Sequence, residues 1–225
     1  MRPRIIDSPP ARPPVAELAA LWRSCGPISS DEEVKAWMDE CGICAQRVRD
    51  ADLARVLPKD AVLPRWARYR SIPWSSGGYR VVVPLYGATG EKEALYARSL
   101  APLRPSSLST RSTPPAVGHR GLVMANRIGR EMLRTGRLPD PPAWSTAVVV
   151  GGAADFLEWA SSFPTWNAPV VLGMVPGTWT PELAARIPSE TRVIVRVFRN
   201  PITERYAHRL QLLLGQRCEV IVKTT

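Results

Sequence analysis

The sequence is poor in the residues that build disulfide scaffolds and many metal centres, with four cysteines and two histidines among 225 residues. So few cysteines do not indicate a disulfide framework, and we expect a reducing, cytoplasmic compartment. No apolar run approaches the roughly 18 residues that a membrane span needs. No apolar segment follows the basic start of the chain either, so we expect neither a membrane anchor nor a signal peptide.

Acidic residues are also scarce, with 20 against 30 basic ones and a formal net charge of +10. Residues 63–145 carry 13 basic and 4 acidic side chains, whereas residues 1–62 carry 9 and 10, and residues 146–225 carry 8 and 6. A concentrated basic segment is typical of proteins that contact a phosphate backbone. A solvated basic face is an equally good interpretation of the charge alone.

The N-terminal part of the chain predicts a tail followed by a small helical unit. Five prolines fall within residues 1–14, which we expect to form a flexible tail. Residues 15–62 have the spacing of short helices, over 15–25, from residue 30 onwards, and over 50–56. Ser30-Asp31-Glu32-Glu33 fits a capping box in which Ser30 caps the second helix.

The remaining chain predicts an α/β fold. Within the basic segment, residues 79–86 and 94–98 read as the two strands of a β-hairpin. Residues 146–225 then alternate between apolar strand patterns and helical patterns. Such alternation predicts a parallel sheet with flanking helices, forming a separate C-terminal domain.

One segment of this domain, residues 148–157, carries the strongest motif. An apolar strand ends on Gly151-Gly152, and a helical pattern that includes Asp155 follows immediately. In parallel α/β sheets, ligands bind at such carboxyl ends of strands. The segment resembles the first motif of Toprim domains, the metal-binding fold of bacterial primases and topoisomerases, which reads Glu-Gly-x-x-Asp. Gly152 and Asp155 fit that motif, whereas Gly151 stands where the family has its catalytic glutamate.

The resemblance extends over residues 65–225. Val83-Pro84-Leu85-Tyr86, Gly90 and Ala97-Arg98 are similar to the hairpin subdomain that precedes the Toprim domain in bacterial primases. Pro105-Ser106-Ser107-Leu108 is similar to a Pro-Lys-x-Leu segment, with serine in place of the lysine. The order of the elements also agrees with that of the primase core.

The second Toprim motif is Asp-x-Asp, which lies shortly before a helix that bears a Tyr-Ala pair. Alignment on Tyr206-Ala207 places Phe198 and Asn200 at the two aspartates. Mg²⁺ requires carboxylate oxygens, and Toprim chemistry uses that ion for phosphoryl transfer. The resemblance therefore implies a Toprim-like α/β fold whose metal site has degenerated, with no resident cofactor, and with Mg²⁺ only if some activity survives. The vestigial positions are Gly151, Asp155, Phe198 and Asn200.

Aromatic and basic side chains alternate at the start of the basic segment, where Trp66 and Trp74 lie among several arginines. Single-stranded nucleic acid is bound by this combination, through phosphate pairing and base stacking. Two tryptophans that pack the hairpin under a basic surface would give the same pattern. The predicted nucleic-acid-binding residues are Arg65, Trp66, Arg68, Arg70, Trp74, Arg80 and Arg98.

The pair Cys41-x-x-Cys44 is the remaining candidate for chemistry. Half of a zinc site and a redox pair are both consistent with the spacing. Cys41 also falls on the apolar face of its predicted helix, so core packing is the favoured interpretation.

The sequence thus leaves three hypotheses. In the first, the chain is a non-catalytic protein of DNA replication or mobile-element maintenance that binds single-stranded DNA or primer–template, in the cytoplasm or at the nucleoid. In the second, it retains a metal-dependent primase or nucleotidyl transferase activity that uses acids supplied by Asp155 or by a partner chain. In the third, the vacant site has become a surface for a replication protein partner.

Overall fold

The computed structural model describes residues 12–69, 72–100, 119–138, 145–175, 179–199 and 201–224. The helices are α1 (Val15–Ser24), η1 (Ile28–Ser30), α2 (Glu32–Glu40), α3 (Ala45–Asp50), α4 (Arg127–Thr135), α5 (Ala153–Ser162), η3 (Thr165–Asn167), α6 (Pro181–Ala184) and α7 (Pro201–Leu214). The strands are β1 (Arg55–Val56), β2 (Arg68–Tyr69), β3 (Ile72–Pro73), β4 (Tyr79–Tyr86), β5 (Lys92–Ser99), β6 (Met124–Ala125), β7 (Thr146–Gly151), β8 (Val170–Met174), β9 (Arg192–Val197) and β10 (Glu219–Thr224).

The C-terminal part forms a five-stranded sheet in the order β10-β9-β7-β8-β6. Four of these strands run parallel, and the short edge strand β6 runs antiparallel to β8. The predicted mixed α/β architecture with a mostly parallel sheet and flanking helices is confirmed.

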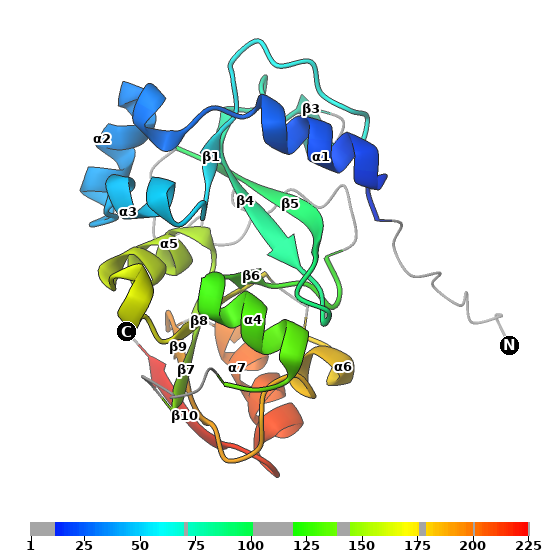
Figure 1. Ribbon diagram of the computed structural model, residues 1–225, viewed down its shortest axis with the longest axis vertical. Helices are drawn as coiled ribbons and strands as arrows, with labels where there is room; N and C mark the ends of the chain where they lie inside the picture. The colour runs from blue at the N-terminus through cyan, green and yellow to red at the C-terminus, as the bar shows by residue number, and fades with distance from the viewer. Residues whose placement is uncertain are drawn as a thin grey trace, which may run out of the picture.

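The two faces of this sheet belong to two different cores. Along β7, Val148 and Val150 point into a cluster that contains Phe156 of α5, whereas Ala147 and Val149 point into the opposite one. This alternation is the period-two pattern of a strand that is covered on both faces. Figure 1 shows α5 on the side of the hairpin, and residues of α4, α6 and α7 belong to the core on the other face.

The predicted hairpin is confirmed as the antiparallel pair β4 and β5, to which β1 adds a third strand. It meets the parallel sheet through a backbone bridge between Tyr86 and Val123, whose two N–H···O distances are 2.8 and 3.0 Å. Val123 directly precedes β6. The apolar cluster that contains Val148 and Val150 of β7 also contains side chains of α2 and β4. The N-terminal helices, the hairpin and the parallel sheet therefore share a core.

The N-terminal helices differ from the prediction in two respects. The cap of α2 is Asp31, whose Oδ1 accepts from the Val34 N–H at 3.0 Å, whereas Ser30 ends the 3₁₀ helix and donates to the Pro27 carbonyl. The predicted helix over 50–56 is wrong, because α3 ends at Asp50 and residues 55–56 pair with β4. Backbone pairing with an available strand outweighs the weak helical pattern there.

The predicted tail also needs a correction at its end. Arg12 forms an ion pair with Glu93 at 3.0 Å and donates to the Arg120 carbonyl at 2.8 Å, and Pro13 is buried. Residues 12–14 are therefore packed against the hairpin, and residues 1–11 lie outside the described residues. The longest described helix, α7, has 14 residues, and no helix in the described ranges could cross a membrane.

Candidate functional site

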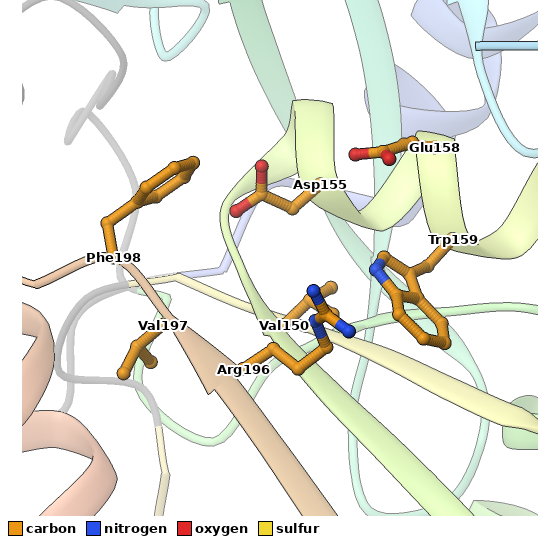
Figure 2. Close-up of a pocket in the computed structure, with 7 residues that line it drawn as sticks. All are labelled: Val150, Asp155, Glu158, Trp159, Arg196, Val197 and Phe198. Carbon is orange, nitrogen blue, oxygen red and sulfur yellow. The ribbon is translucent and has the colours of Figure 1, made fainter. Parts of the chain in front are cut away.

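The carboxyl ends of β7 and β9 lie side by side, because these two strands are parallel neighbours in the sheet. A pocket of about 210 Å³ opens there. Figure 2 shows the side chains that line it, which come from β7, α5, β9 and the residue after β9. They are Val150, Asp155, Glu158, Trp159, Arg196, Val197 and Phe198.

The turn from β7 into α5 positions the acidic side chains of this pocket. Gly152 has φ of +99°, a conformation that residues with a Cβ rarely adopt, and its N–H donates to the Met174 carbonyl at 3.1 Å. The helix therefore begins directly at the strand end. Asp155 lies in its first turn and Glu158 one turn later, so both face the pocket.

Asp155 has an unusual proton affinity. Burial, followed by the neighbouring Glu158 carboxylate, raises the pKa of Asp155 from 3.8 to about 7, although Arg98 and Arg196 act in the opposite direction. Arg196 is also held in place, since its guanidinium lies 4.7 Å from the centre of the Trp159 ring. A carboxyl group that titrates near neutral pH in a pocket is a marker of functional sites.

The residues of this pocket do not fit a divalent metal ion of the Toprim type. Gly151 supplies no ligand, and Phe198, which is 40% exposed, offers no oxygen atom. Arg196 places a positive charge in the same pocket, and a hard cation needs carboxylates rather than arginine beside it. Among the described residues, no three histidine, cysteine or acidic side chains are grouped to hold a metal. Asn200 lies outside the described residues.

The predicted stacking residues lie mainly inside the protein. Trp74 is 1% exposed, and Trp66 packs edge-on against it with ring centres 5.7 Å apart. Trp66 is half-buried, and its Nε1 donates to Glu17 of α1 at 2.9 Å. Burial overturns the expectation that Trp74 stacks on a base, because its ring forms part of the core under the hairpin.

Two of the predicted phosphate contacts are buried as well. Arg80 is 6% exposed and is bonded to Asp31, Glu33 and the Leu57 carbonyl, so it serves the fold. Arg98 is 3% exposed and lies 6.0 Å from the Trp37 ring centre, which corrects its assignment to the surface.

Among the described residues, the other arginines predicted to bind nucleic acid do not form one surface patch with Arg80 and Arg98. Arg65 and Arg68 are exposed, and Arg70 lies outside the described residues. Sequence reasoning missed a different basic group, formed by Lys92 of β5 with Arg127, Arg130 and Arg134 of α4. The spacing of three, four and seven residues between these arginines was the available signal, because it places them on one face of a helix.

The cysteines, all within the described residues, form no disulfide bond. Cys41 is half-buried against the core, Cys44 is exposed, and Cys25 is buried; all three are free thiols. Burial, with smaller electrostatic effects, raises the pKa of Cys41 and raises that of Cys25 to about 12. A raised pKa disfavours the thiolate that metal binding and redox exchange require.

Known proteins provide no independent assignment for this pocket. Comparison of the chain with known protein families, with curated proteins and with solved structures finds no match.

Proposed function

We propose that this chain is a primase-like Toprim protein that binds single-stranded DNA or primer–template and has lost metal-dependent phosphoryl transfer. The observation that carries the proposal is the pocket at the adjacent ends of β7 and β9. Phe198 lines this pocket and Gly151 ends β7, and the family resemblance assigns both positions to acids. The order of elements around it, a hairpin followed by the sheet, supports the same resemblance.

The topology supports this proposal in a further way. The two Toprim motifs lie far apart in the sequence, and they can form one site only if the first and third strands of the parallel domain are neighbours. Those strands are β7 and β9, which pair in parallel from Thr146 opposite Arg192 to Val150 opposite Arg196. The residues that follow both strands therefore meet at one edge of the sheet.

The electrostatics favour an anionic partner. The chain has a formal net charge of +10, and most of the excess lies in residues 63–145. Within that segment, arginines of the described ranges are exposed at positions 65, 68, 120, 127, 134 and 137. Such a surface favours association with a phosphate backbone, with an affinity that decreases as salt increases.

The test is the fluorescence anisotropy of a labelled single-stranded oligonucleotide, measured from about 50 to 300 mM salt, with Mg²⁺ and with EDTA. We expect salt-sensitive binding that is indifferent to the metal. Arg68→Glu should weaken it, whereas Lys223→Glu on β10, which makes the same charge change at another exposed site, should weaken it less. Absence of binding at physiological salt would refute the proposal and direct attention to protein partners.

One observation favours a second candidate, a residual nucleotidyl transferase. Asp155 and Glu158 share the pocket, and Asp155 has a pKa of about 7. Paired acids of this kind occur in catalytic sites. Primer synthesis on a single-stranded template with Mn²⁺ or Mg²⁺, abolished by Asp155→Ala, would establish this activity; no product under either metal would remove it.

A further inference from the structure

A second pocket, of about 350 Å³, lies between the β4–β5 hairpin and α4. It is separate from the pocket at the ends of β7 and β9, and the two share no lining residue. Tyr86 at the end of β4, Lys92 at the start of β5, and Arg127 and Arg130 of α4 contribute to its wall.

The hairpin turn fixes the shape of this pocket by resting directly on α4. Gly90 has φ of +75°, and a Cβ atom at this position would lie 2.6 Å from the Arg130 carbonyl oxygen and 3.0 Å from the Arg134 Cβ. Glycine alone permits both the backbone conformation and the close approach. The donors on β4, on β5 and on α4 therefore keep a defined spacing.

Tyr86 provides a buried donor. The residue is 6% exposed, and burial, partly offset by Arg130, raises the pKa of its phenol, so the hydroxyl stays protonated at neutral pH. The hydroxyl oxygen accepts from Arg130 Nη1 at 3.3 Å, and the Arg130 guanidinium lies 5.3 Å from the Tyr86 ring centre. Within the described residues, the hydroxyl hydrogen has no acceptor.

The charges around the pocket leave an excess of cations. Asp52 is paired with Arg55 at 3.0 Å and Glu131 with Arg134 at 2.6 Å. In the part of the chain that the structure describes, Lys92 and Arg130 form no salt bridge, while Glu91 is the remaining acid on the wall.

Lys92 is a half-buried member of this group of cations. Its ammonium lies 4.4 Å from the centre of the Trp22 ring, and a second cation, Arg55, lies over the same ring at 4.5 Å. Burial lowers the pKa of Lys92; Arg55 and Arg130 act in the same direction, and Asp52 opposes them. A bound anion would relieve this repulsion between neighbouring positive charges.

We propose that this pocket binds a phosphate group, supplied by a nucleic-acid backbone or by a free nucleotide, through Lys92, Arg130 and the Tyr86 hydroxyl. A guanidinium, an ammonium and a hydroxyl donor match the several acceptor oxygens of phosphate, and charge-assisted bonds of this type are strong. If the phosphate belongs to a nucleic-acid backbone, this inference deepens the proposed function and rests on it. Recognition of a phosphate group as such does not rest on the proposed function.

The first measurement is titration calorimetry with inorganic pyrophosphate, followed by ATP and then by a single-stranded oligonucleotide. We expect Lys92→Gln and Arg130→Gln each to weaken pyrophosphate binding by about tenfold, because each removes a charge-assisted hydrogen bond. Tyr86→Phe should weaken it by about threefold, since it removes one neutral donor and keeps the ring. Lys223→Gln, a charge loss on β10, is the matched control and should leave binding unchanged; thermal melts confirm that each variant is folded.

The outcomes separate this inference from the proposed function. Pyrophosphate binding that depends on Lys92 and Arg130, without oligonucleotide binding, supports the phosphate site and refutes the nucleic-acid function. Oligonucleotide binding that is equal in wild type and in Lys92→Gln and Arg130→Gln supports the function and removes the backbone as the source of the phosphate. Pyrophosphate binding that is absent, or equal in wild type and in these two variants, overturns the site. Preference for ATP over the oligonucleotide, lost in the same variants, identifies the nucleotide as the source of the phosphate.

Discussion

The guanidinium of Arg80 on β4 is bonded to the carboxylate of Asp31, the residue that also caps α2. One carboxylate thus serves two elements, with Oδ1 on the Val34 N–H and Oδ2 on the arginine. Burial raises the pKa of Asp31, but the hydrogen bond from Val34 and the charge of Arg80 outweigh it, and the net pKa is lowered. This pair attaches the helical unit to the hairpin sheet.

Arg80→Ala should lower the free energy of unfolding by about 2–4 kcal/mol, because it leaves the capping carboxylate and the Leu57 carbonyl without their buried partner. Denaturant unfolding measures the change. Arg65→Ala, at an exposed position, is the control and should stay within about 0.5 kcal/mol of wild type. A loss of DNA affinity without a loss of stability would show that Arg80 contacts nucleic acid after all.

Gly90→Ala should destabilise the protein more than Gly78→Ala. Both glycines have positive φ, +75° and +73°, so the backbone strain of a Cβ, about 1 kcal/mol, is common to the two. A Cβ at Gly78 meets nothing within 4 Å, whereas one at Gly90 would overlap the Arg130 carbonyl. The difference between the two melting temperatures therefore measures how much the close contact between the hairpin turn and α4 contributes to stability. Equal shifts in the two variants would show that the turn can move away from α4 at no cost.

Asp155 should make the protein less stable as pH rises. Its folded-state pKa of about 7 exceeds the ordinary 3.8, so its stabilising contribution is complete below about pH 4 and is lost as pH rises through 7. His119 has the opposite effect on stability. Burial, and to a smaller extent Arg12, lowers its pKa to about 4, so His119 makes the protein less stable as pH falls from about 6.5 to 4. The free energy of unfolding of wild type minus that of Asp155→Asn should fall by about 1–3 kcal/mol between pH 5 and 8. A flat difference would mean that the carboxyl is solvated.

Carboxylates placed at positions 151 and 198, which the proposed Toprim resemblance assigns to acids, should create metal affinity. A Cβ at Gly151 would lie 3.9 Å from Asp155 Oδ2 and 3.9 Å from the Arg196 carbonyl, which is ordinary contact, so the backbone accepts a side chain there. Gly151→Glu combined with Phe198→Asp should bind Mn²⁺ at least about tenfold more tightly than wild type, as followed by electron paramagnetic resonance of the free ion. Adding Asp155→Asn should cancel the gain. Unchanged affinity in a folded double variant would argue against a shared site.

Local patterns in the sequence were sufficient to predict the elements of the C-terminal sheet. The helical pattern after Gly152 predicts a helix over 153–162, and α5 spans these residues. A similar pattern over 126–135 predicts a helix that Gly136 ends, and α4 ends there, with φ of +69° at Gly136. Thr203 has the preference of a helix cap and predicts that the last helix begins after it. This prediction is wrong, because α7 begins at Pro201 and the Thr203 hydroxyl donates to the Phe198 carbonyl. Hydrophobic periodicity specifies the body of an element better than its ends.

The basic surface could not be derived in the same way. Arg80 and Arg98 lie on strands that are buried on both faces. The sequence does not show that Arg80 pairs with a carboxylate and that Arg98 lies over an aromatic ring in the folded protein. Lys92 and Arg130, 38 positions apart, meet only because the hairpin turn packs on α4. Juxtaposition of this kind depends on tertiary packing, which local periodicity does not encode.

The bridge between Tyr86 and Val123 has a consequence for how this protein can respond to a ligand. Because β6 continues from that bridge and pairs with β8, backbone hydrogen bonds run without a break from the hairpin into the parallel sheet. A hinge between the two sheets would have to break these bonds and open a common core. We therefore expect a ligand of either pocket to bind without domain closure and at a small cost in ordering entropy.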